Sequence, residues 1–192
     1  MSDEFHAAPD SVSGNEINAF RDADGRISVL WLERLRAFLD AGRADDVALV
    51  MERLHTADMG DVLEQLEPEE RLALVRMMGD AFDYSALTEV DESIRVEIMD
   101  ALPNAEIARG VAELDNDDAV FLLEDLEKED QDEILSALPT FERLVLKRSL
   151  DFPEESAGRR MQTEFIAIPP FWTVGQTIDY LRAEKDLPDE FY

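Results

Sequence analysis

The chain contains an internal repeat, which restricts its possible folds more than any other feature. Four consecutive blocks of 24 residues, beginning at residues 55, 79, 103 and 127, align without a gap as far as residue 150. Apolar side chains recur at four positions of every block. The first position holds Leu63, Leu87, Val111 and Leu135; the second Leu66, Val90, Leu114 and Leu138; the third Leu74, Ile98, Leu122 and Leu146; the fourth Met78, Leu102, Leu126 and Leu150. Because so small a unit cannot bury an apolar face alone, neighbouring blocks have to stack.

Each block contains a signal for a second helix start between its two apolar clusters. These signals are Glu67-Pro68, Asp91, Asp115 and Pro139-Thr140. Proline is tolerated in the first turn of a helix, and aspartate at a helix start caps free backbone amides. The pattern therefore predicts an all-α fold over residues 26–150, a superhelical stack of helix-turn-helix repeats with about ten helices. An incomplete α/β fragment is expected to follow it.

The segment before the repeats has two parts. Residues 1–25 are small, polar and acidic without a sustained apolar period, and they predict a flexible tail. A first helix is predicted from the spacing that begins at Ile27, with Gly42 able to end it. Its apolar face comprises Leu30, Trp31, Leu35, Phe38 and Leu39. Residues 31–54 match the repeat positions only partly, as expected of an N-terminal cap.

The pattern changes after the last block. Residues 151–162 predict a connector containing a short helix over Glu154–Met161, and residues 163–192 predict the truncated start of another domain. There Glu164–Ile168 is expected to be a strand and Thr173 to cap a helix through Arg182, with Val174, Ile178 and Leu181 facing inward. A strand and a helix without further elements leave edges unpaired. We therefore expect this part to be cut from a larger protein and to be displaced, disordered or completed by another chain.

Composition excludes several classes of function. The formal net charge of −28 repels phosphate backbones, so nucleic acid is not expected as a partner. The absence of cysteine excludes disulfides and thiolate metal sites, and the two histidines, His6 and His55, lie far apart in sequence. No nucleophile–base set or glycine-rich phosphate loop is found, so an enzyme is not expected. With no apolar run of about 20 residues and an acidic start, the chain itself is expected to be soluble and cytosolic.

Several of these motifs resemble the MgtE magnesium transporter family over about residues 27–182. The matching segments are Leu54–Asp58, Leu66–Arg71, Leu114–Ala119, and Glu155-Ser156-Ala157-Gly158 with Met161 and Glu164–Ile168. The last of these resembles the junction between the helical N domain and the first of two CBS domains. The family commonly has Met-Thr-Pro where this chain has Met161-Gln162-Thr163.

The resemblance implies a regulatory role in a larger protein. It implies a homodimeric transporter whose cytosolic N and CBS domains bind Mg²⁺ and hold the pore closed when intracellular magnesium is plentiful. The expected partners are the CBS and transmembrane domains of the parent transporter, on the cytoplasmic side of the cell membrane. The charge gives an independent physical reason, since acidic domains that repel each other can be bridged by an ion that prefers hard oxygen ligands.

The resemblance also implies the metal ligands. Asp117 and Asp118 lie where the family contributes a carboxylate to an ion shared with the CBS region, and Asp117 is the closer match. The other interpretation is that both aspartates occupy the first turn of a helix, where negative charge favours the macrodipole. A second family position for a metal-binding glutamate falls near Ser85, so that ligand is not carried over.

Two further interpretations remain. The segment Asp22–Ile27 looks like part of an EF-hand loop, but the first and last ligand positions would fall on Phe20 and Trp31, so a turn or helix cap is favoured. The acidic runs Glu67–Glu70, Asp115–Asp118 and Glu124–Glu133 are typical of solvated faces.

The alternative to a magnesium sensor is a free-standing helical-repeat adaptor that mediates protein–protein interaction.

Overall fold

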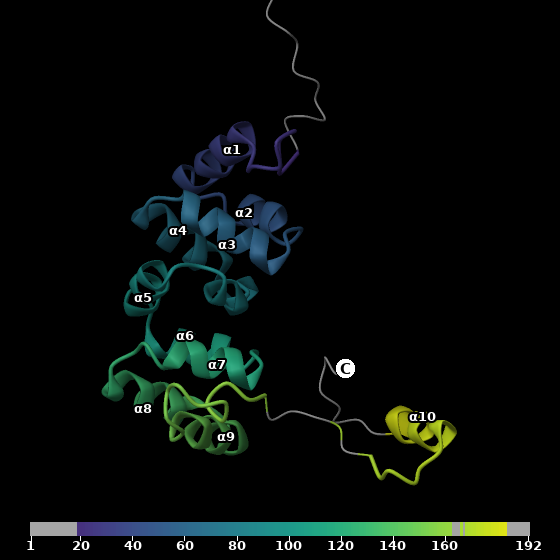
Figure 1. Cartoon of the computed structure of the whole chain (residues 1–192). Helices are drawn as coiled ribbons and strands as arrows, with labels where there is room; N and C mark the ends of the chain where they lie inside the picture. Colours follow the sequence, from purple (N-terminus) through teal and green to yellow (C-terminus); the bar gives the residue numbers. More distant parts are fainter. Residues whose placement is uncertain (1–18, 163–165, 167, 184–192) are drawn as a thin grey trace, which may run out of the picture. The chain divides into compact units, whose positions relative to one another are not determined.

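The structure, a computed structural model, describes residues 19–162, 166 and 168–183 (Figure 1). Within these residues ten α-helices and two 3₁₀-helices follow one another, without a strand apart from an isolated antiparallel bridge between Arg21 and Ile27. The predicted all-α class is confirmed. The chain divides into two compact units, Met1–Ile98 and Met99–Tyr192.

The first unit is built around the opening helices and the first two blocks of the repeat. Its elements are α1 (Val29–Asp40), α2 (Ala44–Met51), α3 (Thr56–Gln65), α4 (Pro68–Met78), η1 (Gly79–Ala81), η2 (Tyr84–Thr88) and most of α5 (Glu92–Asp100). Helix α1 packs on α2 and α4, α2 packs on α4, and α3 packs on η2. Their fully buried side chains include Leu35, Val47, Met51, Val62, Leu63, Leu74 and Leu87. Gly42 follows α1 with a φ of 63°, which suits glycine and ends that helix as predicted.

The second unit contains the last two blocks. Its elements are α6 (Asn104–Val111), α7 (Asn116–Leu123), α8 (Lys128–Ala137), α9 (Thr140–Leu150) and α10 (Val174–Ala183). Helix α6 packs on α8, and both α7 and α8 pack on α9. The side-chain amide of Asn104 donates to Asp130 and Glu133, each at 2.9 Å, and so ties the start of α6 to α8.

Burial confirms the register of the repeat. The first and third apolar positions of all four blocks are at most 3% exposed. At the second and fourth positions the side chains are also buried, except for Leu114 and Leu150, which are half-buried. Apolar burial at about 25 cal/mol per Å² is the main favourable term in folding, so these positions form the core that stacking was expected to create.

The second block differs from the other three. Blocks one, three and four open with the α-helices α3, α6 and α8, whereas block two opens with the 3₁₀-helices η1 and η2. Between them, Phe82 and Tyr84 are both buried and form an edge-to-face pair with ring centroids 5.2 Å apart. Asp83 accepts the backbone N–H of Ser85 at 3.0 Å and starts η2. A continuous helix would not place residues two apart in one core, so the aromatic pair favours a break at Asp83.

The predicted helix starts are confirmed in position. Helix α4 begins with Pro68 after Glu67, whose backbone N–H donates to Glu70 at 2.9 Å in a capping box. Asp115 occupies the N-cap position of α7, although its side chain forms no capping hydrogen bond there. His55 caps α3, since its Nδ1 accepts the N–H of Ala57 at 3.3 Å.

The glutamate at one repeat position finds its capping hydrogen bond in the first block but not in the last. Glu142 stands in α9 where Glu70 stands in α4, but the residue before α9 is Pro139, which has no N–H to donate. Among the described residues, Glu142 Oε2 is buried without a hydrogen-bond partner. The substitution of a proline at the helix start explains this orphaned oxygen.

The segment that resembles an EF-hand forms a closed turn, as the turn interpretation predicts. Asp22 Oδ1 accepts the N–H groups of Asp24 at 2.9 Å and Arg26 at 3.0 Å, and Gly25 adopts a φ of 77°. Arg21 pairs with Asp58 and Asp61 of α3. Its hydrogen bonds to Asp61 and then Asp58 raise the pKa of the Arg21 guanidinium. The predicted tail, residues 1–25, lies largely outside the described residues, which begin at residue 19 and include this turn.

Two C-terminal predictions need correction and one is confirmed. Residues 154–160 form successive turns and Met161 belongs to no helix, so the predicted helix over Glu154–Met161 is wrong. Helix α10 is present, and Thr173 caps it through its Oγ1, which accepts the N–H of Gln176 at 3.3 Å. Val174 and Ile178 were expected to face inward but are 77% and 40% exposed. The predicted strand over Glu164–Ile168 falls mostly outside the described residues, and its two described members, Ile166 and Ile168, belong to no strand.

Candidate functional site

The two predicted metal ligands lie in the first turn of α7. Asp117 and Asp118 follow the N-cap residue Asp115, and both are half-buried. Carboxylates at this place are stabilised by the partial positive charge of the helix start. The helix start alone is therefore a sufficient reason for the two aspartates, and its partial positive charge disfavours a bound cation. Their oxygen chemistry nevertheless suits Mg²⁺, which takes hard carboxylate ligands and keeps several waters.

The neighbourhood of Asp117 does not supply further protein ligands in one cluster. Within the described part of the chain, no group of three or more histidine, cysteine, aspartate or glutamate side chains is placed to hold a metal ion. Asp118 already takes part in an interaction of its own. At the other position that the family resemblance singled out, Ser85 donates its hydroxyl hydrogen to Asp83 and belongs to the turn that starts η2.

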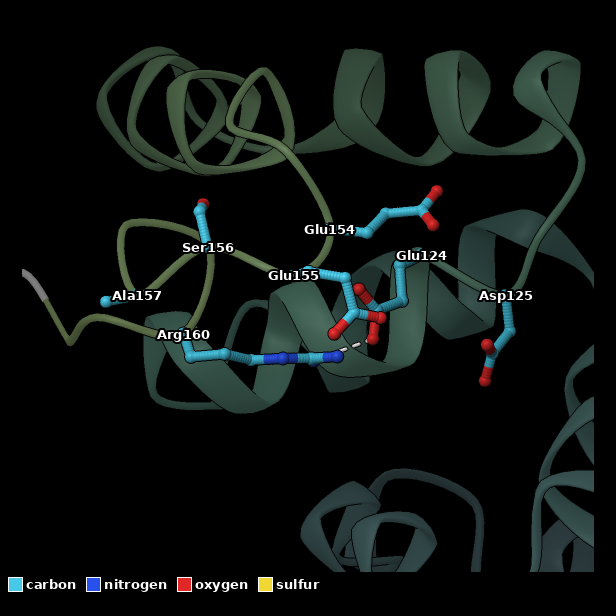
Figure 2. Close-up of a pocket in the computed structure, with 7 residues that line it drawn as sticks. All are labelled: Glu124, Asp125, Glu154, Glu155, Ser156, Ala157 and Arg160. Atoms are coloured by element: carbon cyan, nitrogen blue, oxygen red, sulfur yellow. Dashed lines mark ion pairs between the residues drawn. The ribbon is translucent and has the colours of Figure 1, made fainter.

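An acidic cleft lies at the opposite end of the same helix. Figure 2 shows this cleft, which has a volume of about 480 Å³ and lies between the end of α7 and the turns that follow α9. Its lining comprises Glu124, Asp125, Glu154, Glu155, Ser156, Ala157 and Arg160. The Ser156-Ala157 motif that resembles a domain junction therefore lies against α7.

Glu124 holds two arginines at this cleft. Its Oε1 lies 2.6 Å from Arg160 Nη1, the pair that is dashed in Figure 2, and its Oε2 lies 3.2 Å from Arg159 Nε. The Glu124 side chain is only 11% exposed. The interpretation of Glu124–Glu133 as a solvated face is thus wrong at its first residue. The adjacent arginines in a strongly acidic chain were the one signal in the sequence, but nothing there specified their partner.

No helix among the described residues is both long enough and apolar enough to span a membrane. The described helices are at most 12 residues long, which falls short of the roughly 20 that a bilayer requires.

Several known proteins are similar to this chain in sequence or in fold. The family described as the MgtE intracellular N domain matches residues 54–155. The magnesium transporter MgtE of Bacillus subtilis (strain 168) is 20% identical over 156 residues, which are 81% of this chain and 35% of that protein. A crystal structure described as the soluble part of a magnesium transporter superposes with a TM-score of 0.66 at 23% identity, covering 84% of this chain and 64% of that one.

These matches differ in what they establish. The solved structure, at this identity, establishes the shared fold. The chain spans about a third of the curated relative and under two thirds of the solved chain. The family match covers more than half of the chain, including all four blocks of the repeat. The chain therefore belongs to the MgtE intracellular N domain family.

Proposed function

We propose that this chain is the cytosolic magnesium-sensing regulatory region of an MgtE-type magnesium transporter. It closes on the CBS domains of the parent transporter when Mg²⁺ is high, and closure gates the pore. The parent acts as a homodimer at the cell membrane, with this region on its cytoplasmic side. The family membership and the net charge of −28 support this proposal.

The charge provides the physical basis of the response. A domain with this excess of carboxylates is repelled by another acidic surface, and the repulsion weakens only gradually as monovalent salt screens it, with a Debye length of about 10 Å at 0.1 M. A divalent ion held between two surfaces instead replaces repulsion by attraction at a specific point. Closure therefore depends on the concentration of Mg²⁺ rather than on ionic strength alone.

Asp117 is the proposed ligand on this side of the contact, with Asp118 as its neighbour. Mg²⁺ is commonly bound by one or two carboxylates and completes its octahedron with water. One half-buried aspartate, exposed enough to reach an ion, meets that requirement. The remaining ligands come from the CBS region and from water.

The single observation that carries the proposal is the match of residues 54–155 to a transporter domain family. The test joins this chain to the CBS domains of the parent and measures its radius of gyration by small-angle scattering. Millimolar Mg²⁺ should compact the protein, and monovalent salt of equal ionic strength should do so much less. Equal compaction by both salts would show screening alone and would contradict a sensing role.

One observation favours the second candidate, a helical-repeat adaptor. Phe141 and Leu144 lie on the exposed side of α9, with 72% and 61% of their surfaces accessible. Exposed apolar side chains of this kind occur at protein–protein contacts. Under this alternative, partner binding would be lost in a Phe141→Ser variant and would not depend on Mg²⁺, whereas the sensor proposal requires dependence on Mg²⁺.

A further inference from the structure

The segment after α9 folds back on the second unit. Its turns are closed by backbone hydrogen bonds from Ser156 to Pro153 at 2.9 Å and from Arg160 to Ala157 at 3.2 Å. The Ser156 hydroxyl also donates to the Pro153 carbonyl at 2.7 Å. Residues 153–160 are therefore an ordered structure with its own hydrogen bonds, and we call them the exit turn.

Arg159 connects the exit turn to two helices at once. Its Nε lies 3.2 Å from Glu124, the C-cap residue of α7, and its Nη1 donates to the carbonyls of Leu150 and, at 3.1 Å, of Phe152. Carbonyls at the end of a helix lack intrahelical partners, and a guanidinium with several fixed donors can satisfy them together. Arg159 thus serves both the end of α7 and the end of α9.

We call Glu124, Arg159 and Arg160 the clamp, and its inner pair, Glu124 and Arg159, is shielded from water. The side chains of Arg159 and Glu124 are 8% and 11% exposed, whereas Arg160 is 47% exposed. Arg160 closes the outer side of the clamp, with its guanidinium carbon 5.3 Å from the centre of the Phe121 ring. Removing one partner of such a buried pair leaves an uncompensated charge, which is among the more disruptive single changes.

Close packing at Gly158 also limits the exit turn. A Cβ added to Gly158 would lie 2.9 Å from Cδ1 of Phe152. Only glycine allows the backbone to approach the ring this closely without a shift. The turn is thus held by the two arginines and by its close packing against the Phe152 ring.

We propose that Glu124, Arg159 and Arg160 are positioning residues that fix the direction in which the chain leaves the helical repeat. The rigid part that contains α7 and α9 then extends through Arg160 rather than ending after α9. A hinge at Asp151 would let the exit turn move independently of the repeat. Because of the clamp, the exit turn instead moves together with α7 and α9.

Trypsin tests this proposal on the chain as it stands, because it cleaves after Arg159 and Arg160. Glu124→Gln keeps the size of the side chain and both cleavage sites but removes the charge that holds the arginines. We expect cleavage at these two bonds to become at least tenfold faster. The matched control is Glu113→Gln, an exposed glutamate of the same unit, which should be cleaved at the native rate.

Hydrogen exchange separates opening of the turn from unfolding of the unit. In Glu124→Gln the amides of Ser156, Arg159 and Arg160 should exchange at least tenfold faster, while those of α8 keep their native rates. Arg159→Lys, which retains the charge and a trypsin site but loses the planar fork, should open the turn to a similar extent. Native cleavage and exchange rates in Glu124→Gln would overturn the proposal. So would equal acceleration in α8, because the clamp would then be part of the general core rather than a local joint.

Discussion

Glu70 and Glu142 occupy the same position of the 24-residue repeat, in the block that begins at residue 55 and in the one that begins at 127. Glu70 accepts the N–H of Glu67 at 2.9 Å and pairs with Arg36 Nε at 3.0 Å. Glu142 follows Pro139 and has a buried Oε2 without a partner in the described structure. Replacing each glutamate by methionine keeps the length of the side chain and the helix propensity similar, so the two variants isolate the polar contacts.

The expected changes in the free energy of unfolding differ in sign between the two variants. Glu70→Met loses a capping hydrogen bond of about 1 kcal/mol. It also loses an ion pair of about 0.5 kcal/mol, discounted because both side chains are a quarter to a third exposed. The favourable first-turn charge, about 0.5 kcal/mol, disappears in both variants. Glu142→Met, however, relieves a buried unpaired oxygen whose desolvation costs about 1–2 kcal/mol.

Glu70→Met should therefore destabilise the first unit by about 2 kcal/mol, and Glu142→Met should make the second unit about 0.5–1.5 kcal/mol more stable. Native-state hydrogen exchange measures each unit separately. Amides of α4 should exchange about 30-fold faster in Glu70→Met, since 1.4 kcal/mol corresponds to tenfold. If α9 amides in Glu142→Met are accelerated as much, the assignment of an unsatisfied oxygen at Glu142 is refuted.

Three further outcomes are expected from urea or exchange measurements. Leu122→Ala, at a fully buried repeat position, should cost about 3 kcal/mol, and Leu144→Ala, 61% exposed, less than about 0.5 kcal/mol; equal costs would contradict the burial pattern. Gly60→Ala should destabilise the first unit by about 1–3 kcal/mol because the new Cβ would lie 2.8 Å from Glu89 Cβ, and a gain in stability would show that α3 can shift. Asp22→Ala should weaken the N-terminal turn by about 1 kcal/mol and accelerate exchange of the two amides it binds, and unchanged exchange would remove its capping role.

The core could be predicted from the sequence because its signal is periodic. Leu63 and Leu135 stand in register across the blocks, and packing within its own unit buries each of them. The opening of the second block could not be predicted by the same reasoning. Its repeat register is intact, but the spacing of Phe82 and Tyr84 and the side-chain hydrogen bond of Asp83 favour 3₁₀ turns locally.

The candidate sites were predictable only in part. Asp117 and Asp118 are adjacent and belong to a recognisable helix start, so their place in α7 follows from local pattern. Glu124 and Arg159 are 35 residues apart, and only the packing of the exit turn against α7 brings them together. The turn differs from the predicted helix because Ser156 and Arg159 bind nearby carbonyls, which helical periodicity does not take into account.

The most direct test of the magnesium-sensing account is protease protection of this chain joined to the CBS domains of its parent, titrated with Mg²⁺. If this region senses magnesium, Mg²⁺ protects the protein and monovalent salt of equal ionic strength does not. Asp117→Ala should shift the protecting Mg²⁺ concentration upward by on the order of tenfold, a loss typical of disturbed metal sites. Asp118→Ala is the neighbouring comparison and should shift it less. Protection of Asp117→Ala at the same Mg²⁺ concentration as the unmodified protein would reduce Asp117 to a helix-start residue, and an unmodified protein that Mg²⁺ does not protect would contradict the sensing role itself.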